Sequence, residues 1–111
     1  MKGNELLSRA LVLLGRDGGT DDSLAVRGAN VINQILLDLK LSPLERLSSD
    51  AGLSPAQEDA VCYGAAMLLS VTEGDTGRNA FLTQAYSAKR AAALAKTERV
   101  SDCLPTVTEG G

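Results

Sequence analysis

The sequence contains no histidine and no tryptophan, and only 3% of its 111 residues are aromatic. Without histidine, the chain lacks the commonest metal ligand and the commonest general base at neutral pH. Its two cysteines, Cys62 and Cys103, match no metal-binding or redox spacing. We therefore expect no catalytic residue, no cofactor and no metal site. We interpret Cys62 as a small buried apolar residue, and Cys103 as a free thiol or a fold-back contact.

Phosphate-binding and paired-carboxylate motifs are also missing. The segment GRDGGT lacks the Lys-Ser/Thr ending of a phosphate-binding loop, and no predicted strand precedes it. The acidic pairs Asp21–Asp22 and Glu58–Asp59 fall at the starts of predicted helices, where the helix dipole favours them without any catalytic role. The sequence therefore predicts a protein that is not an enzyme.

Neither charge nor hydropathy points to a nucleic acid or a membrane. The net charge is −3, so the whole chain offers no positive field to polyanions or anionic lipids. The apolar run near the N-terminus is too short and too interrupted by charge to span a bilayer. We expect no membrane partner.

Hydrophobic residues make up 44% of the chain, and they are mostly leucine, alanine, valine and isoleucine. This composition is typical of a small helical bundle, because β-sandwiches favour aromatic and β-branched residues. The length suits one domain. We predict an all-α fold: a compact bundle of about four helices over residues 1–96, with a short connector, followed by an extended C-terminal tail or arm over residues 97–111.

The predicted bundle is organised around the segment from Ser54 to Gly74, which is apolar on nearly every face. Ser54 is a favourable N-cap, Pro55 fits the first helical position, and Gln57 completes a capping box. Gly74 supplies a left-handed stop. Because the helix between these ends is apolar all round, we expect other helices to cover it on several sides.

Two amphipathic helices precede this segment. The first is capped by Asn4, ends at Gly15, and has one apolar face of Leu6, Leu7, Ala10, Leu11 and Leu14. The second is capped by Thr20 and Asp21 with Asp22, is ended by Pro43, and has the apolar stripe Leu24, Gly28, Val31, Ile32, Ile35 and Leu39. A glycine on that stripe predicts the close approach of another backbone. The opposite side is either a solvated face, which we favour, or a partner-binding face; it comprises Arg27, Asn30, Asn33, Gln34 and Asp38.

A fourth helix is predicted from about Arg78 to Lys96 in an alanine-rich sequence. Its apolar side comprises Phe81, Leu82, Ala85, Ala88, Ala92 and Ala95. The run Ala91–Ala93 widens this surface and favours a second contact partner. The basic residues of its C-terminal half suit the helix dipole; a nucleic-acid patch is the less favoured reading, because no aromatic residues are interleaved for stacking. These are Lys89, Arg90, Lys96 and Arg99.

Two peripheral segments complete the chain. The connector LERLSSDAGL carries leucines that either cover the end of the bundle, which we favour, or touch a neighbouring subunit, and a short hairpin there stays open. The last residues form either a free tail or an arm that orders against another chain. Our candidate residues for a subunit or partner interface are Leu44, Leu47, Lys89, Arg90, Ala91, Val100, Leu104 and Val107.

Three stretches, ELLSRALVLLG, DSLAVRGANVINQILLDL and YGAAMLLSVTEGDTGRNAFLTQAYSAKRAA, together resemble the head-tail connector proteins of tailed bacteriophages, also called head completion or adaptor proteins. The resemblance runs from about Asn4 to Ala93 and rests on helix order and degenerate patterns without an invariant motif. Some members carry a long hairpin between helices, for which only LERLSSDAGL is available here.

The resemblance implies a virion structural protein, assembled in the host bacterial cytoplasm as a ring that is typically of twelve copies. Its partners would be further copies of itself, the portal protein, and tail or head-closure proteins, with C-terminal segments docking on the portal or an adjacent subunit. Such a ring extends the DNA channel, and packaged DNA passes without specific binding. The alternative is a small helical nucleic-acid-binding or regulatory domain, suggested by Lys89 and Arg90.

Overall fold

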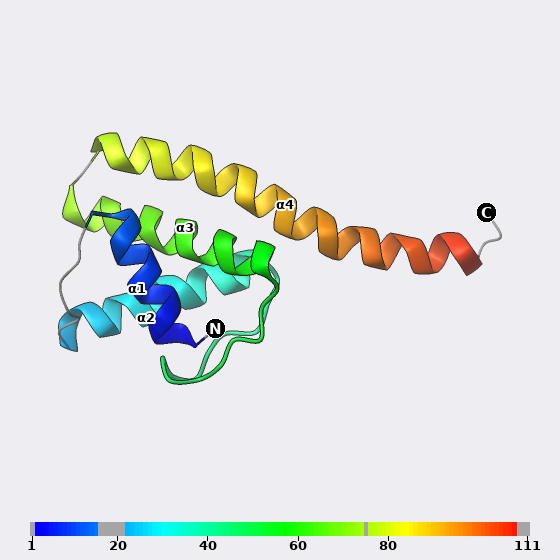
Figure 1. Cartoon of the computed structure of the whole chain (residues 1–111), viewed down its shortest axis with the longest axis horizontal. Coiled ribbons are helices and arrows are strands. Elements are labelled where there is room, and N and C mark those ends of the chain that lie inside the picture. The colour runs from blue at the N-terminus through cyan, green and yellow to red at the C-terminus, as the bar shows by residue number, and fades with distance from the viewer. Residues whose placement is uncertain (1, 16–21, 75, 109–111) are drawn as a thin grey trace.

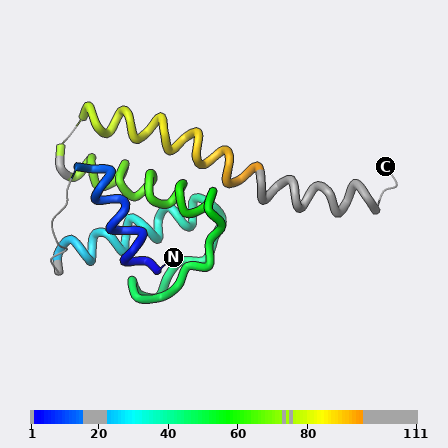
Figure 2. Tube along the Cα trace, viewed as in Figure 1, coloured from blue at the N-terminus to red at the C-terminus, as the bar shows by residue number. Residues whose placement is uncertain are grey.

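The computed structural model describes the backbone of residues 2–15, 22–74 and 76–108 (Figure 1). It describes the side chains in these ranges other than those of residues 22, 73 and 96–108 (Figure 2). These ranges contain no strand, only an isolated antiparallel bridge between Lys2 and Asp50. The predicted all-α bundle is confirmed, and its helices are α1 (Gly3–Leu13), α2 (Asp22–Asp38), α3 (Pro55–Glu73) and α4 (Thr76–Thr108).

Helix α3 is the centre of the bundle, as predicted, and contacts α1, α2 and α4 (Figure 1). At its start, the Ser54 hydroxyl accepts the Gln57 N–H at 3.3 Å, and the Gln57 side chain accepts the Ser54 N–H at 2.9 Å. At its end, Gly74 has a φ of 73°, in the left-handed region that glycine adopts without steric cost. Both ends of the helix therefore follow from local residue chemistry.

The core lies between α3 and its three neighbours. Glycines on two buried faces let helices approach closely. A Cβ at Gly28 would lie 2.6 Å from the Leu7 side chain, so the predicted close approach is confirmed, although a side chain and not a backbone fills the space. A Cβ at Gly64 would lie 2.8 Å from both Ile35 and Tyr86. The largest fully buried apolar side chains are Leu6, Leu7, Ile32, Leu36, Leu69, Leu82 and Val61.

Two predicted helix ends are wrong. Helix α1 is capped by Lys2 and not by Asn4, because the Lys2 N–H is satisfied by Glu5 at 2.7 Å while the Asn4 N–H bonds the connector. Helix α2 ends at Asp38, well before Pro43, since Lys40 adopts a left-handed φ of 63°. The Lys40 and Leu41 N–H groups then bond the carbonyls of Leu37 and Leu36, which is the Schellman arrangement. The expected caps at Thr20 and Asp21 lie outside the described residues.

The connector folds back over the start of α1. Asn33 of α2 holds it by accepting the Leu44 N–H at 2.8 Å and donating to the Leu44 carbonyl at 3.2 Å. The Asn4 N–H donates to the Leu47 carbonyl at 2.8 Å, and the Gly3 N–H donates to Ser49 at 3.1 Å. The connector forms no hairpin, and its leucines pack against the core as favoured from the sequence; they are Leu41, Leu44, Leu47 and Leu53.

The predicted apolar side of α4 is largely wrong. The helix buries Leu82, Tyr86 and Ala93, whereas Phe81 is 62% exposed; Ala88, Ala92 and Ala95 are also exposed. Alanine occurs all round this helix, so the apolar pattern has too little contrast to define one face. In Figure 1, α4 continues to Thr108, past the predicted end at Lys96 and beyond the bundle. The division into a bundle of residues 1–96 and a tail of residues 97–111 stays a prediction.

Candidate functional site

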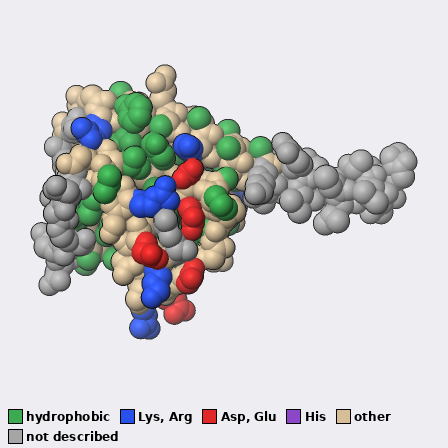
Figure 3. Space-filling model, in the orientation of Figure 1, with side chains coloured by type: hydrophobic (Ala, Val, Ile, Leu, Met, Phe, Trp, Pro, Cys, Tyr) green, Lys and Arg blue, Asp and Glu red, His purple; other side chains and the backbone are tan. Residues whose placement is uncertain are grey.

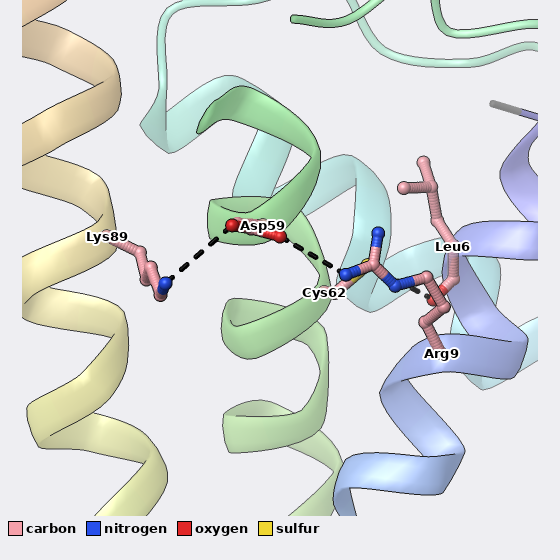
Figure 4. A network of polar contacts seen from close by, with 5 residues as sticks. All are labelled: Leu6, Arg9, Asp59, Cys62 and Lys89. Carbon is pink, nitrogen blue, oxygen red and sulfur yellow. Dashed lines mark hydrogen bonds and ion pairs between the residues drawn. The ribbon is translucent and has the colours of Figure 1, made fainter. Parts of the chain in front are cut away.

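Asp59, in the second turn of α3, joins three helices (Figure 4). Its Oδ1 accepts from Arg9 of α1 at 3.2 Å, and its Oδ2 lies 3.6 Å from the Lys89 ammonium of α4. The same ammonium lies 5.3 Å from the centre of the Tyr63 ring, a cation–π distance. The charged side chains are 39% to 46% exposed, so each ion pair contributes about 0–1 kcal/mol. The pairs orient α1 and α4 on α3 more than they stabilise the fold.

An open groove of about 260 Å³ surrounds this junction and is lined by Arg9, Val12, Leu13, Asp59, Tyr63 and Lys89. The cations in it already share the Asp59 carboxylate. Among the lining residues there is neither a nucleophile nor a base placed to activate one. The groove therefore offers positioning of helices and no recognisable chemistry.

A second junction links the end of α2 to α4. The Tyr86 hydroxyl donates to Asp38 Oδ2 at 2.6 Å, and Arg90 Nε donates to the same oxygen at 2.7 Å. These bonds, Tyr86 first, hold the pKa of Asp38 below its usual value of 3.8. Burial, followed by the bond to Asp38, raises the pKa of Tyr86 above its usual value of 10.0. The tyrosine that sequence analysis counted as polar is thus a buried contact of α4.

Hydroxyl and amide groups near the α3–α4 turn are bonded within the protein. A hollow of about 170 Å³ there is lined by Ser70, Val71, Gly74, Thr76 and Asn79. Ser70 Oγ donates to the Met67 carbonyl at 2.6 Å, and Asn79 donates to Ser70 Oγ at 3.0 Å. With its proton given to a backbone carbonyl and no base beside it in the described part of the chain, Ser70 is not arranged as a nucleophile.

Cys62 is fully buried, and its thiol lies 3.7 Å from the Leu6 carbonyl (Figure 4). Burial raises the pKa of this thiol to about 11, so it stays protonated at neutral pH and is neither a nucleophile nor a metal ligand. The interpretation of Cys62 as a small apolar core residue is confirmed. The side chain of Cys103 lies outside the described ones. Within the described ranges, no three Cys, Asp or Glu side chains are grouped to hold a metal ion.

The structure does not bring the candidate interface residues together in one patch. Leu44 and Leu47 pack near the start of α1. Lys89 and Arg90 face aspartates of α3 and α2, which balance their charges, and this weakens the nucleic-acid interpretation. Ala91 is exposed on α4. The side chains of Val100, Leu104 and Val107 lie outside the described ones.

Two outward helix faces carry no charge. We define the α4 face as Phe81, Gln84, Ala88, Ala91, Ala92 and Ala95, all exposed. We define the α2 face as Ser23, Val26, Asn30, Gln34 and Leu37, also all exposed. Val26, Leu37 and Phe81 are each at least 60% exposed. Outward faces of helices in soluble proteins usually carry charged residues, so these two faces are candidates for protein contacts.

The charged side chains lie elsewhere. Figure 3 shows lysine, arginine, aspartate and glutamate side chains gathered over α1 and the start of α3, while hydrophobic and uncharged atoms cover most of α4. Sequence analysis missed the outward α4 face because it assigned the same alanines and Phe81 to the core. Their spacing at positions 81, 88, 92 and 95 was the available signal, but it does not say which way the face points.

No protein family model, curated protein or solved structure matches the chain. In the described ranges, the helices lack the combination of length and hydropathy needed to cross a bilayer.

Proposed function

We propose that this chain is a structural adaptor of a tailed-phage virion, a head-tail connector without catalytic activity. It docks on the portal, extends the DNA channel and provides the platform for tail attachment. The observation that carries the proposal is the uncharged, apolar outward face of α4, since an adaptor acts through protein contacts and needs such a surface on a rigid bundle. The helix order and the sequence resemblance support the choice of this family.

The proposed partners follow from this role. A ring requires two different surfaces on each subunit that meet head to tail, and the described bundle offers more than one uncharged face. Further contacts are with the portal and with tail or head-closure proteins. With a net charge of −3, the ring neutralises few DNA phosphates, so packaged DNA passes without specific binding. Assembly takes place in the host bacterial cytoplasm.

The test uses the portal protein encoded by the same genome. The chain and the portal are mixed at high concentration and analysed by size-exclusion chromatography with light scattering. We expect a complex in which many copies of the chain join one portal ring, visible by electron microscopy. Absence of both portal binding and any ring overturns the proposal. Binding to duplex DNA at low salt that weakens on Lys89→Ala with Arg90→Ala supports the nucleic-acid alternative instead.

A further inference from the structure

The α2 face and the α4 face point outward on different sides of the bundle. Each lies opposite the buried residues of its own helix, and both helices contact α3. Figure 1 shows α4 along one side of α3 and α2 along another. The molecule therefore presents two distinct uncharged surfaces, as a subunit in a head-to-tail assembly must.

The two faces differ in the size of their side chains. Val26 and Leu37 of the α2 face are 62% and 60% exposed, and they lie eleven positions apart, which is roughly 16 Å along a helix. The α4 face is mostly alanine beyond Phe81. Large side chains of one helix pack well into the shallow surface that small residues leave on another. The α2 face thus fits the α4 face better than either face fits itself.

Charge narrows the choice of occupant to a second copy of this chain. A partner with charged residues at the contact would bury them against faces that offer no ion pair, which is costly. When the α2 and α4 faces meet, no charged side chain of either face is buried. The charged surface over α1 and the start of α3, visible in Figure 3, is left in solvent.

We infer that the α4 face of one subunit packs against the α2 face of the next copy. This inference rests on the proposed function, because it names the contact between adjacent subunits of the ring. Residues 80–95 span roughly 22 Å, and a contact one helix wide is smaller than the ~800 Å² per partner of a standard interface. Each contact is therefore weak in isolation, and a closed ring engages both faces of every subunit.

Disulfide trapping tests this contact directly. In a Cys103→Ser background, Ala88→Cys on the α4 face is combined with Gln34→Cys on the α2 face, and the protein is mildly oxidised at high concentration. Cys62 is fully buried and does not interfere. We expect a ladder of dimers, trimers and longer species on a non-reducing gel. The control pair, Ala88→Cys with Glu45→Cys in the exposed connector, should give at most traces.

Two results overturn the contact. One is a double variant that cross-links no better than the control pair. The other is Ala88→Cys alone forming a dimer as efficiently, which would mean that two α4 faces meet each other. A second variant checks the surface without a disulfide bond. Ala88→Glu should lower the yield of trimers and longer species about tenfold by burying a charge, while Ser8→Glu on α1 leaves it unchanged; circular dichroism checks that both variants fold.

Portal binding separates this inference from the proposed function. A ladder without portal binding supports the contact and overturns the adaptor role. Rings formed on the portal by a double variant that gives no ladder overturn the contact and support the role.

Discussion

At the scale of single residues, a missing methyl group decides how closely three helices meet. Gly64 of α3 lies where Ile35 of α2 and Tyr86 of α4 converge, each 2.8 Å from the position a Cβ would take. Atoms that close must move apart, and a packed core transmits such a shift to its neighbours. The glycine therefore has a packing role that outweighs its low helix propensity.

Gly64→Ala should destabilise the fold by about 1–2 kcal/mol, because overpacking exceeds the gain of up to about 1 kcal/mol in helix propensity. Urea unfolding followed by circular dichroism measures the change. Gly77→Ala in α4 is the matched control, since a Cβ there meets nothing within 4 Å. An equal effect at both positions would contradict the packing explanation.

Lys40 holds a backbone conformation that suits glycine better. Its φ of 63° places a Cβ-bearing residue in the left-handed region, at a cost of about 1–2 kcal/mol. Lys40→Gly should therefore raise the free energy of unfolding by about 1 kcal/mol, measurable as a higher midpoint in urea. A loss of stability would show that the lysine side chain makes a compensating contact.

At the scale of elements, local signals in the sequence predicted α3 well and α4 poorly. The Ser54, Gln57 and Gly74 signals define the ends of α3 through bonds that span only a few residues. The face of α4 depends on which of many alanines meets α3, and no local rule decides that. The end of α2 was missed for a related reason, because sequence analysis relied on Pro43 while a left-handed lysine ends the helix.

The side-chain junctions could not be predicted from local patterns. Arg9 and Asp59 are 50 residues apart in the sequence, and Asp38 and Arg90 are 52 apart. Only the packing of α1 and α4 on α3, and of α2 beside α4, brings these pairs together. What sequence analysis recovered was therefore the set of helices and most of the core, while the charge pairing and the outward faces required the three-dimensional arrangement.

The Tyr86–Asp38 bond between α4 and α2 should make stability depend on pH. Asp38 has a lowered pKa in the folded state, so its contribution is present above pH 3.8 and is lost as the pH falls through and below that value. Tyr86→Phe should cost about 1 kcal/mol at pH 7, and the difference from the unmodified protein should narrow in acid. The Asp38 side chain is 45% exposed, so screening by water keeps the effect modest.

Thermal unfolding of both proteins from pH 7 down to about pH 2, below the usual range of Asp, provides the measurement. Ser87→Ala, at an exposed position of α4, is the control and should give parallel curves. A difference for Tyr86→Phe that stays constant across the whole range would show that the hydroxyl acts without the ionised carboxylate.

At the scale of the whole molecule, charge is distributed unevenly over the surface. Ionised side chains gather over α1 and the start of α3 (Figure 3), and the α2 and α4 faces carry none. This arrangement directs self-association toward the uncharged sides. It also leaves the proposed contact without ion pairs to be screened by salt.

Self-association should therefore depend little on ionic strength. Raising the salt concentration from about 0.05 M to about 0.5 M shortens the screening length roughly threefold and should change the yield of the disulfide-linked ladder by less than about twofold. A steep fall in yield with salt would show that charged residues carry the contact, which would shift attention to the groove around Asp59.

Cys62 provides a means to follow the core in time. Its thiol is enclosed in α3 and faces the Leu6 carbonyl of α1, so a thiol reagent reaches it only after α1 separates from α3. In a Cys103→Ser background, the labelling rate measures how often that separation occurs, and the Gly64→Ala variant should be labelled faster. A labelling rate as fast as that of the urea-unfolded chain would contradict this. The chain thus carries its own reporter of core opening at one defined helix contact.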